Sequence, residues 1–388
     1  MVWFLSLVTV LVALWAFARL FLGGRNLSAF DFPVYDPVRE APSPEHSDVL
    51  HLLGEMGKSV QGLRGRDRLH KLRELFHHMS DDVELTDVSI APADADGVPG
   101  EWVIPAGYDG QGRLLYIHGG AFVLGSATGY RRVTAQLARK TGLAVLAIDY
   151  RLMPEHRRRD GIKDCQTAYR WMLKNGPTDR SAAKSAFIAG DSAGGNLTLM
   201  LVAWSRDKEA RDKEARDKEA RDKEARDKAA GDEGLRPPDG AIALSPATDS
   251  AFASPSLKHN AEDDPMLGPL AAMVNRVPRT LLLYFAWANG RIRPCDPVVS
   301  PVRGSLADLP PILIQASEAE ILIDDARRYV NKARHEGTPA ELETWHGMIH
   351  VWQAFAGHLP EADEAYDRIS AFVERCRPEP GSTAADAA

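Results

Sequence analysis

The most informative segment of the chain is Phe187-Ile188-Ala189-Gly190-Asp191-Ser192-Ala193-Gly194-Gly195-Asn196. It opens with a short apolar run that suits a buried strand, and an apolar helical pattern begins after it at Leu197. The Gly-x-Ser-x-Gly pattern between them predicts a sharp strand-to-helix turn that exposes the hydroxyl of Ser192. An ordinary glycine-rich turn would show the same five residues. The pattern therefore has chemical meaning only if the rest of the chain supplies a base, an acid and an oxyanion hole.

Length and composition limit the classes of protein that need to be considered. A chain of 388 residues can bury a large core in one α/β domain or in two smaller ones. The formal net charge of −7 gives no basic face for nucleic acid. The three cysteines, Cys165, Cys295 and Cys376, are far apart and lack metal-ligand spacing. We therefore expect neither a disulfide framework nor a cysteine metal site.

The N-terminus departs from the pattern of a soluble enzyme. Residues 1–18 contain no charged side chain and would reach roughly 27 Å as a helix, and apolar residues resume after Arg19. We expect a membrane-spanning anchor over residues 1–24, with a signal peptide and a buried core helix as the alternatives. Because Arg19 and Arg25 both follow the apolar run, the positive-inside rule places the rest of the protein in the cytoplasm.

The residues between the expected anchor and residue 104 predict a linker, two helices and a hairpin. Helical spacing of apolar residues within 51–80 predicts two helices. Alternating residues predict strands over 84–90 and 101–104, and Asp94-Ala95-Asp96-Gly97 lies between them as a hairpin-like turn.

From residue 114 onward, apolar runs that suit strands alternate with amphipathic patterns that suit helices. The predicted strands cover residues 114–117, 143–148, 186–189, 241–244, 312–315 and 342–345. The predicted helices cover residues 130–140, 162–175, 323–335 and, with a break near Pro360, 351–376. This order predicts an α/β fold with a mostly parallel sheet flanked by helices. In such a sheet, functional residues lie beyond the carboxyl ends of the strands.

A charged repeat interrupts this regular order. Residues 206–225 repeat Arg-Asp-Lys-Glu-Ala four times, and residues 226–230 form a degraded fifth copy. The segment has strong helix formers and many opposite charges at helical spacing, but no apolar residue larger than alanine. We expect a solvated helix that continues the one starting near Ser192. A tolerated surface insertion explains the repeat better than a partner-binding arm.

His118-Gly119-Gly120 stands at the end of a predicted strand, upstream of Ser192. The two glycines let the backbone approach a substrate closely, with N–H groups free to point at one oxygen. The predicted oxyanion donors are the N–H groups of Gly119, Gly120 and Ala193.

The base and the acid should follow Ser192 in the order acid, then histidine. His350 comes soon after the strand over 342–345, and His346 is the competing histidine nearby. The candidate acids follow the strand over 312–315. They are Glu318 and Glu320, with Asp324 and Asp325 further on in the next predicted helix.

At this point the chain resembles the hormone-sensitive lipase family of α/β-hydrolases, which includes the bacterial family IV esterases. The matching motifs are His118-Gly119-Gly120-Ala121-Phe122, Asp149-Tyr150-Arg151-Leu152-Met153-Pro154-Glu155-His156, Gly190-Asp191-Ser192-Ala193-Gly194-Gly195-Asn196, Asn260-Ala261-Glu262-Asp263-Asp264-Pro265-Met266-Leu267 and Ile349-His350-Val351-Trp352. The resemblance covers residues 76–372. It implies a serine carboxylesterase with a helical cap, built from the N-terminal segment and an insertion after the strand near Leu244. It also implies that neither a metal nor an organic cofactor is needed.

The acid is the place where the chain departs from the family. Members often carry Gly-Ser-Asp-Glu, whereas this chain has Ser317-Glu318-Ala319-Glu320. Ala319 stands where the aspartate would be, and Glu320 matches the glutamate that serves as the acid in some members. The predicted triad is therefore Ser192, Glu320 and His350. Glu155 and Asp191 also match family positions, where they would hold the oxyanion loop and the turn in place.

The predicted function is hydrolysis of short- to medium-chain or lipophilic carboxylic esters through an acyl-enzyme. One alternative is a deacetylase or amidase that uses the same triad on a small molecule. The other is a non-catalytic receptor or scaffold with the hydrolase fold. The expected partners are an ester substrate and a membrane, with no nucleic acid, and the oligomeric state stays open.

The expected organisation has four parts. A transmembrane anchor covers 1–24, and a linker with N-terminal cap helices covers 25–80. A catalytic α/β-hydrolase domain covers 81–378 and carries the charged repeat at 206–230. A flexible tail covers 379–388.

Overall fold

The computed structural model of the protein describes residues 2–33, 37–221 and 235–378. Its centre is an eight-stranded sheet with the order β1-β2-β4-β3-β5-β6-β7-β8. The strands are β1 (Val88–Asp94), β2 (Pro99–Pro105), β3 (Gly112–Ile117), β4 (Ala144–Ile148), β5 (Ser185–Asp191), β6 (Gly240–Leu244), β7 (Ile312–Ser317) and β8 (Ala340–Trp345). The strands from β3 to β8 pair in parallel, whereas β2 is antiparallel to both β1 and β4. The predicted α/β architecture is therefore confirmed.

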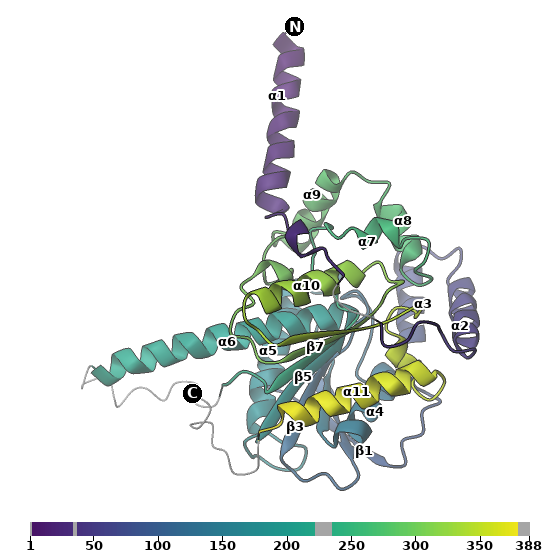
Figure 1. The fold of residues 1–388 in the computed structure, drawn as a ribbon, viewed down its shortest axis with the longest axis vertical. Coiled ribbons are helices and arrows are strands. Elements are labelled where there is room, and N and C mark those ends of the chain that lie inside the picture. Colours follow the sequence, from purple (N-terminus) through teal and green to yellow (C-terminus); the bar gives the residue numbers. More distant parts are fainter. Residues whose placement is uncertain (1, 34–36, 222–234, 379–388) are drawn as a thin grey trace.

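The helices lie on both faces of this sheet and at one of its ends (Figure 1). The helices are α1 (Val2–Phe17), α2 (His46–Ser59), α3 (Gly65–His77), α4 (Arg131–Thr141), α5 (Arg158–Lys174), α6 (Ser192–Arg221), α7 (Ser256–His259), α8 (Gly268–Val274), α9 (Arg279–Gly290), α10 (Ile323–His335) and α11 (Pro360–Cys376). Short helical turns are η1 (Ala18–Leu22), η2 (Ser28–Phe30), η3 (Thr128–Tyr130), η4 (Pro301–Arg303) and η5 (Trp352–Phe355).

The alternation of side chains along the strands builds two hydrophobic cores. Leu115 and Ile188 point to one face, where they pack with residues of α5, α6 and α10. Their neighbours Leu114 and Phe187 point to the other face, where they pack with residues of α4 and α11. Because successive strand residues face opposite sides, an unbroken apolar run fills both cores at once.

The first strand differs from its prediction. The alternating pattern predicts a strand over 84–90, but β1 begins at Val88 and continues through Pro92 to Asp94. Proline lacks the N–H that an interior ladder needs, so it is expected to end a strand. Because β1 is an edge strand of the sheet, one side of its backbone pairs with no other strand, and Pro92 is tolerated there.

The helix that follows Ser192 runs into the charged repeat as expected. Helix α6 starts at Ser192 and continues as far as Arg221, projecting away from the body of the protein (Figure 1). The rest of the repeat and the predicted tail over 379–388 lie outside the described residues.

Three short helices lie between β6 and β7, and we call residues 256–290 the cap segment. Its helices α7, α8 and α9 lie at the end of the molecule from which α1 projects (Figure 1). Trp3–Leu22, which spans α1 and η1, is the one helix among the described residues with the length and apolar composition to cross a membrane.

Candidate active site

Ser192 stands on a tight turn between β5 and α6. Its φ is 51°, in the left-handed region that a serine seldom adopts. The flanking glycines let neighbouring chain segments come very close. A Cβ on Gly194 would lie 1.9 Å from the carbonyl oxygen of Ile117, and one on Gly190 would lie 2.6 Å from the carbonyl oxygen of Gly194. The turn therefore requires glycine at both positions, as the Gly-x-Ser-x-Gly pattern predicts.

The histidine that meets Ser192 is His350. Its Nε2 lies 2.9 Å from the Ser192 Oγ, and the histidine is 3% exposed. It comes from the loop after β8, at the end of the sheet where the carboxyl end of β5 also lies. The competing His346 has an exposed side chain and lies near Glu40, with Nε2 3.7 Å from a carboxylate oxygen.

The acid that meets the histidine is Glu320. One carboxylate oxygen, Oε2, lies 2.6 Å from Nδ1 of His350. The other, Oε1, accepts hydrogen bonds from the Ser245 hydroxyl at 2.7 Å and from the Ser317 N–H at 2.8 Å. Glu320 is fully buried, so these three contacts stabilise a carboxylate that water does not reach.

The other candidate acids are engaged elsewhere. Glu318, on the same loop, forms a partly buried salt bridge with Arg327. Asp324 accepts a hydrogen bond from the Ser256 N–H and pairs with the same arginine. Asp325 accepts hydrogen bonds from the backbone N–H groups of residues 248 and 249. Their described hydrogen bonds and ion pairs thus go to groups other than the histidine.

Two opposing effects act on the pKa of His350. Burial lowers it by penalising the imidazolium, whereas the charge and the hydrogen bond of Glu320 raise it. Asp264 and Asp191 add smaller attractions, and the net result is a pKa above 6.5. An imidazole with this environment readily accepts a proton from a serine hydroxyl, because the resulting charge already has its partner.

The structure contradicts one of the predicted oxyanion donors. The N–H of Gly119 donates to Oδ1 of Asp191 at 2.8 Å in a buried site. It is therefore occupied, and the prediction for Gly119 is wrong. The chain then turns sharply, with φ values of 98° at Gly120, 55° at Ala121 and 64° at Phe122. No hydrogen bond within the described chain is assigned to the N–H of Gly120, Ala121 or Ala193.

Asp191 joins this loop to the turn that carries Ser192. Besides the Gly119 N–H, its carboxylate accepts hydrogen bonds from the hydroxyls of Tyr116 at 2.6 Å and Tyr130 at 3.2 Å. Burial raises the pKa of Asp191, although these hydrogen bonds favour the charged form. The His118 ring packs against the Tyr130 ring in a tilted arrangement, with centroids 5.5 Å apart. The position of Asp191 agrees with the supporting role that the resemblance implies.

Sequence reasoning missed Ser245 and Ala121. Ser245 follows β6 and reaches Glu320 across 75 residues of sequence, so no local pattern identifies it. Ala121 is visible in the glycine-rich motif. Its N–H becomes a candidate oxyanion donor only because Asp191 accepts the hydrogen bond of the Gly119 N–H. Among the described residues, no three His, Cys, Asp or Glu side chains are grouped as metal ligands.

Comparison with known proteins agrees with this fold. A family model described as alpha/beta hydrolase fold matches residues 114–354. An acetyl-hydrolase of Streptomyces hygroscopicus is 33% identical over 276 residues, which cover 70% of this chain and 78% of that protein. An esterase of Acinetobacter venetianus is 32% identical over 286 residues, which cover 74% and 82%.

A solved structure extends the agreement to three dimensions. The crystal structure of an esterase from the bacterial hormone-sensitive lipase family is 30% identical and has a TM-score of 0.69. The match covers 87% of this chain and all of that one. It is therefore the whole fold, and not only the segment around Ser192, that the two proteins share. The chain belongs to the hormone-sensitive lipase family of the α/β-hydrolase superfamily.

Proposed function

We propose that the protein is a serine carboxylic-ester hydrolase that works through an acyl-enzyme. The observation that carries the proposal is the position of His350, with one ring nitrogen at the Ser192 hydroxyl and the other at the Glu320 carboxylate. The related proteins named esterase and acetyl-hydrolase support the same class of reaction.

In the proposed mechanism, His350 Nε2 takes the proton of Ser192 as its Oγ attacks the ester carbonyl carbon. The imidazolium that forms is stabilised by Glu320. It then returns the proton to the departing alkoxide, so an alcohol leaves and the acyl group stays on Ser192. A water molecule, deprotonated by His350, attacks this second ester. The carboxylic acid is released and the serine hydroxyl is restored.

The negative charge on the carbonyl oxygen needs donors at the turn and at the glycine-rich loop. We assign the N–H groups of Gly120, Ala121 and Ala193 to this role, in place of the Gly119 donor expected from the sequence. Asp191 then has a positioning role, because it fixes Gly119 and with it the following two residues. Donors fixed before the reaction stabilise the transition state without reorganising.

A fluorophosphonate probe tests the nucleophile, because it reacts only with an activated serine. We expect the probe to label the protein at Ser192, and the Ser192→Ala variant to remain unlabelled. Failure of the folded protein to react would favour the non-catalytic alternative. Matched ester and amide substrates then separate an esterase from an amidase, and a series of acyl lengths defines the preferred ester.

We further propose that Trp3–Leu22 anchors the protein in a membrane, with the catalytic domain on the cytoplasmic side. The 20-residue length, the apolar composition and the exposure of this helix support an anchor, and a signal sequence shares these properties. The position of Arg19 and Arg25 supports the cytoplasmic orientation. Membrane fractions of expressing cells should retain the full-length chain after washing with alkaline carbonate. Recovery of a shortened chain in the soluble fraction would favour the signal sequence.

A further inference from the structure

Helices α8 and α9 expose large apolar side chains to the surroundings. Phe285 is 71% exposed, Met273 59% and Leu281 57%. We define the cap face as these three residues together with Leu270, Val277 and Trp287, which are also exposed. Clustered apolar side chains of this size mark an interaction surface, because water solvates them poorly.

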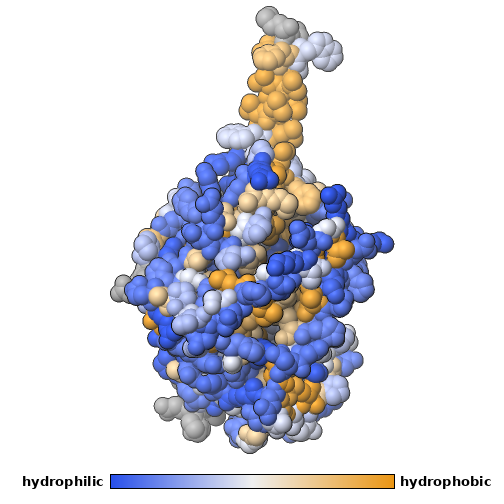
Figure 2. Space-filling view, turned by 90° about the vertical axis from the view of Figure 1, so that its right-hand side faces the viewer, coloured by the Kyte–Doolittle hydropathy of each residue, from blue (hydrophilic) through white to orange (hydrophobic). Residues whose placement is uncertain are grey.

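The cap face lies beside the base of α1. The ring of Phe17 stacks on Tyr284 of α9, with centroids 6.1 Å apart, and lies 5.8 Å from the ring of Trp287. The Tyr284 hydroxyl donates to the carbonyl oxygen of Leu14 at 2.8 Å. Figure 2 shows α1 as an apolar column that rises from a largely hydrophilic surface, with paler apolar groups around its foot. The apolar surface of α1 thus continues onto the cap.

Helices α8 and α9 and the loop that follows them carry charged side chains of one sign. Between Asp264 and Asp296 the chain carries Arg276, Arg279, Arg291 and Arg293 and no acidic residue. The first 30 residues contribute only Arg19 and Arg25. These arginines make α8, α9 and the foot of α1 locally cationic, although the whole chain has a formal charge of −7. The nearest acidic residues along the chain are the buried Asp264 and the exposed Glu262 and Asp263, which precede α8, and Asp296, which pairs with Arg293 at 3.8 Å. Apolar side chains mixed with arginine suit a membrane surface that contains anionic lipid.

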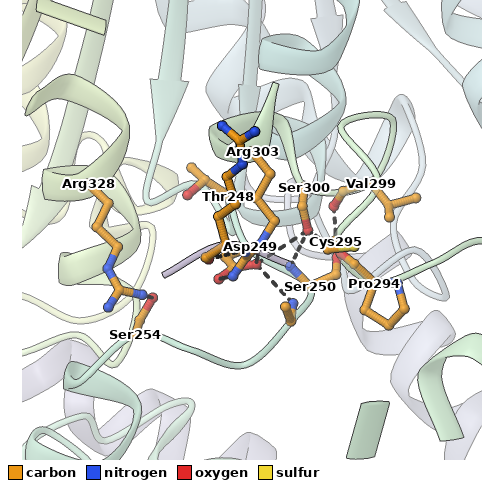
Figure 3. A network of polar contacts seen from close by, with 12 residues as sticks. Thr248, Asp249, Ser250, Ser254, Pro294, Cys295, Val299, Ser300, Arg303 and Arg328 are labelled. Atoms are coloured by element: carbon orange, nitrogen blue, oxygen red, sulfur yellow. Dashed lines mark hydrogen bonds and ion pairs between the residues drawn. The ribbon is translucent and has the colours of Figure 1, made fainter. Parts of the chain in front are cut away.

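The junction between α1 and the body is fixed by polar contacts. The N–H of Cys295 donates to the carbonyl oxygen of Leu22 at 3.2 Å. The Arg303 guanidinium donates to the carbonyl oxygen of Arg25 at 2.9 Å and forms a buried ion pair with Asp249 at 2.7 Å. Figure 3 shows the part of this network around Asp249, with Arg303, Ser250 and Ser300 beside it. A membrane that holds α1 therefore also sets the height and tilt of the cap.

From these contacts we infer that the cap face of α8 and α9 rests in the headgroup region of a membrane containing anionic lipid. The inference rests on the proposal that α1 spans this membrane. The cap face then occupies the depth at which tryptophan, tyrosine and arginine side chains are favoured. A bilayer fits better than a second protein copy, because the cap face continues the apolar surface of α1 and is flanked by arginines.

The cap segment also touches the loop of the proposed acid. The Asn260 side-chain amide donates to the carbonyl oxygens of Glu318 and Glu320, at 2.7 and 3.0 Å. Asp264 accepts a hydrogen bond from the Ile321 N–H at 3.0 Å. The segment that lies on the membrane is thus attached directly to the catalytic loop. An ester dissolved in the bilayer would therefore reach the active site past the cap segment. The substrate class that this route favours is a lipophilic ester.

The position of the cap face can be measured with a fluorescent label on the full-length protein. Cys295→Ser and Cys376→Ser remove the accessible thiols, since Cys165 is buried. An NBD dye is then attached at Phe285→Cys, or at Glu374→Cys on α11 as the control. In phosphatidylcholine–phosphatidylglycerol vesicles that carry shallow spin-labelled lipid, we expect quenching at 285 and none at 374.

The outcomes separate the inference from the anchor on which it rests. Failure of the protein to float with vesicles overturns the anchor and the inference together. Flotation without quenching at 285 overturns the inference alone. Shielding of the 285 dye in lipid-free detergent, accompanied by a dimer, would assign the cap face to a second copy and overturn it too. The requirement for anionic lipid is tested with Arg276→Glu, which should weaken quenching of the dye at 285. Arg180→Glu, far from the cap, is the control and should leave quenching unchanged.

Activity gives a second, independent readout. The double variant Leu281→Asp, Phe285→Asp should hydrolyse an ester embedded in anionic vesicles about tenfold or more slowly, because two exposed apolar side chains that would insert into the headgroup region become charged. Its rate on a soluble short-chain ester should stay unchanged. Equal rates of the variant and the parent on the vesicle ester would contradict the inference. A loss on both substrates without loss of fold would contradict it as well, because the damage would then lie in the site.

Discussion

Nδ1 of His350 lies 2.6 Å from Oε2 of Glu320, although 30 residues separate them in the sequence. The two side chains follow β8 and β7, which are parallel neighbours in the sheet. Parallel strands end at the same edge, so the residues just beyond them meet there. The other ring nitrogen of His350 reaches Ser192, 158 residues upstream, on the same principle. This geometry leads to four predictions about the site.

Replacing Ser192 by alanine removes the proposed nucleophile. We expect turnover of p-nitrophenyl butyrate to fall by at least about 10⁴-fold, because the remaining residues can only bind the substrate and its oxyanion. Circular dichroism and the thermal midpoint should match those of the parent protein. Substantial activity in this variant would refute the serine mechanism.

Glu320→Gln and Glu318→Gln form a matched pair two residues apart. The first should lower kcat by roughly 10⁴-fold, since a neutral amide neither stabilises the imidazolium nor fixes its tautomer. The second loses a partly buried salt bridge with Arg327 that does not involve His350, and it should change kcat by less than about threefold. The opposite order of effects would assign the acid to Glu318.

The pH dependence of kcat/KM should follow the ionisation of His350. Only the neutral imidazole can act as a base, and its pKa is raised above 6.5, so activity should fall as the pH drops through that raised value. In the residual activity of Glu320→Gln the acidic limb should move to lower pH. Burial then lowers the pKa of His350 without the opposing charge of Glu320. A limb at the same pH in both proteins would show that another group titrates.

Ser245→Ala tests the support given to the acid. The variant removes one of the hydrogen bonds to the Glu320 carboxylate, leaving the Ser317 N–H on that oxygen. Because such bonds to charged groups contribute about 1.5–3 kcal/mol, kcat should fall roughly tenfold to a hundredfold with little change in KM. Ser59→Ala, at an exposed helix end, is the control and should be silent. An equal rate in both variants would remove Ser245 from the site.

The order of strands and helices along the chain, and the strand-to-helix turn at Ser192, follow from the sequence by itself. Gly190 and Gly194 indicate the turn because only glycine permits backbones to approach so closely there. The alternating strands and helices indicate the parallel sheet, and the parallel sheet indicates which loops meet. The predicted family and fold are confirmed for this reason. The error at β1 arises because Pro92 is acceptable only in an edge strand, and edge position is not a local property.

Two details of the site depend on the folded molecule. Glu318 and Glu320 differ by only two positions, and the turn after β7 sends one toward Arg327 and the other into the core beneath His350. Gly119 carries a backbone N–H like that of Gly120, but the carboxylate of Asp191, 72 residues away, engages it. Local sequence patterns indicate the order of the strands and helices and the spacing of their apolar residues. The direction of a hydrogen bond depends on partners that only long-range packing brings together.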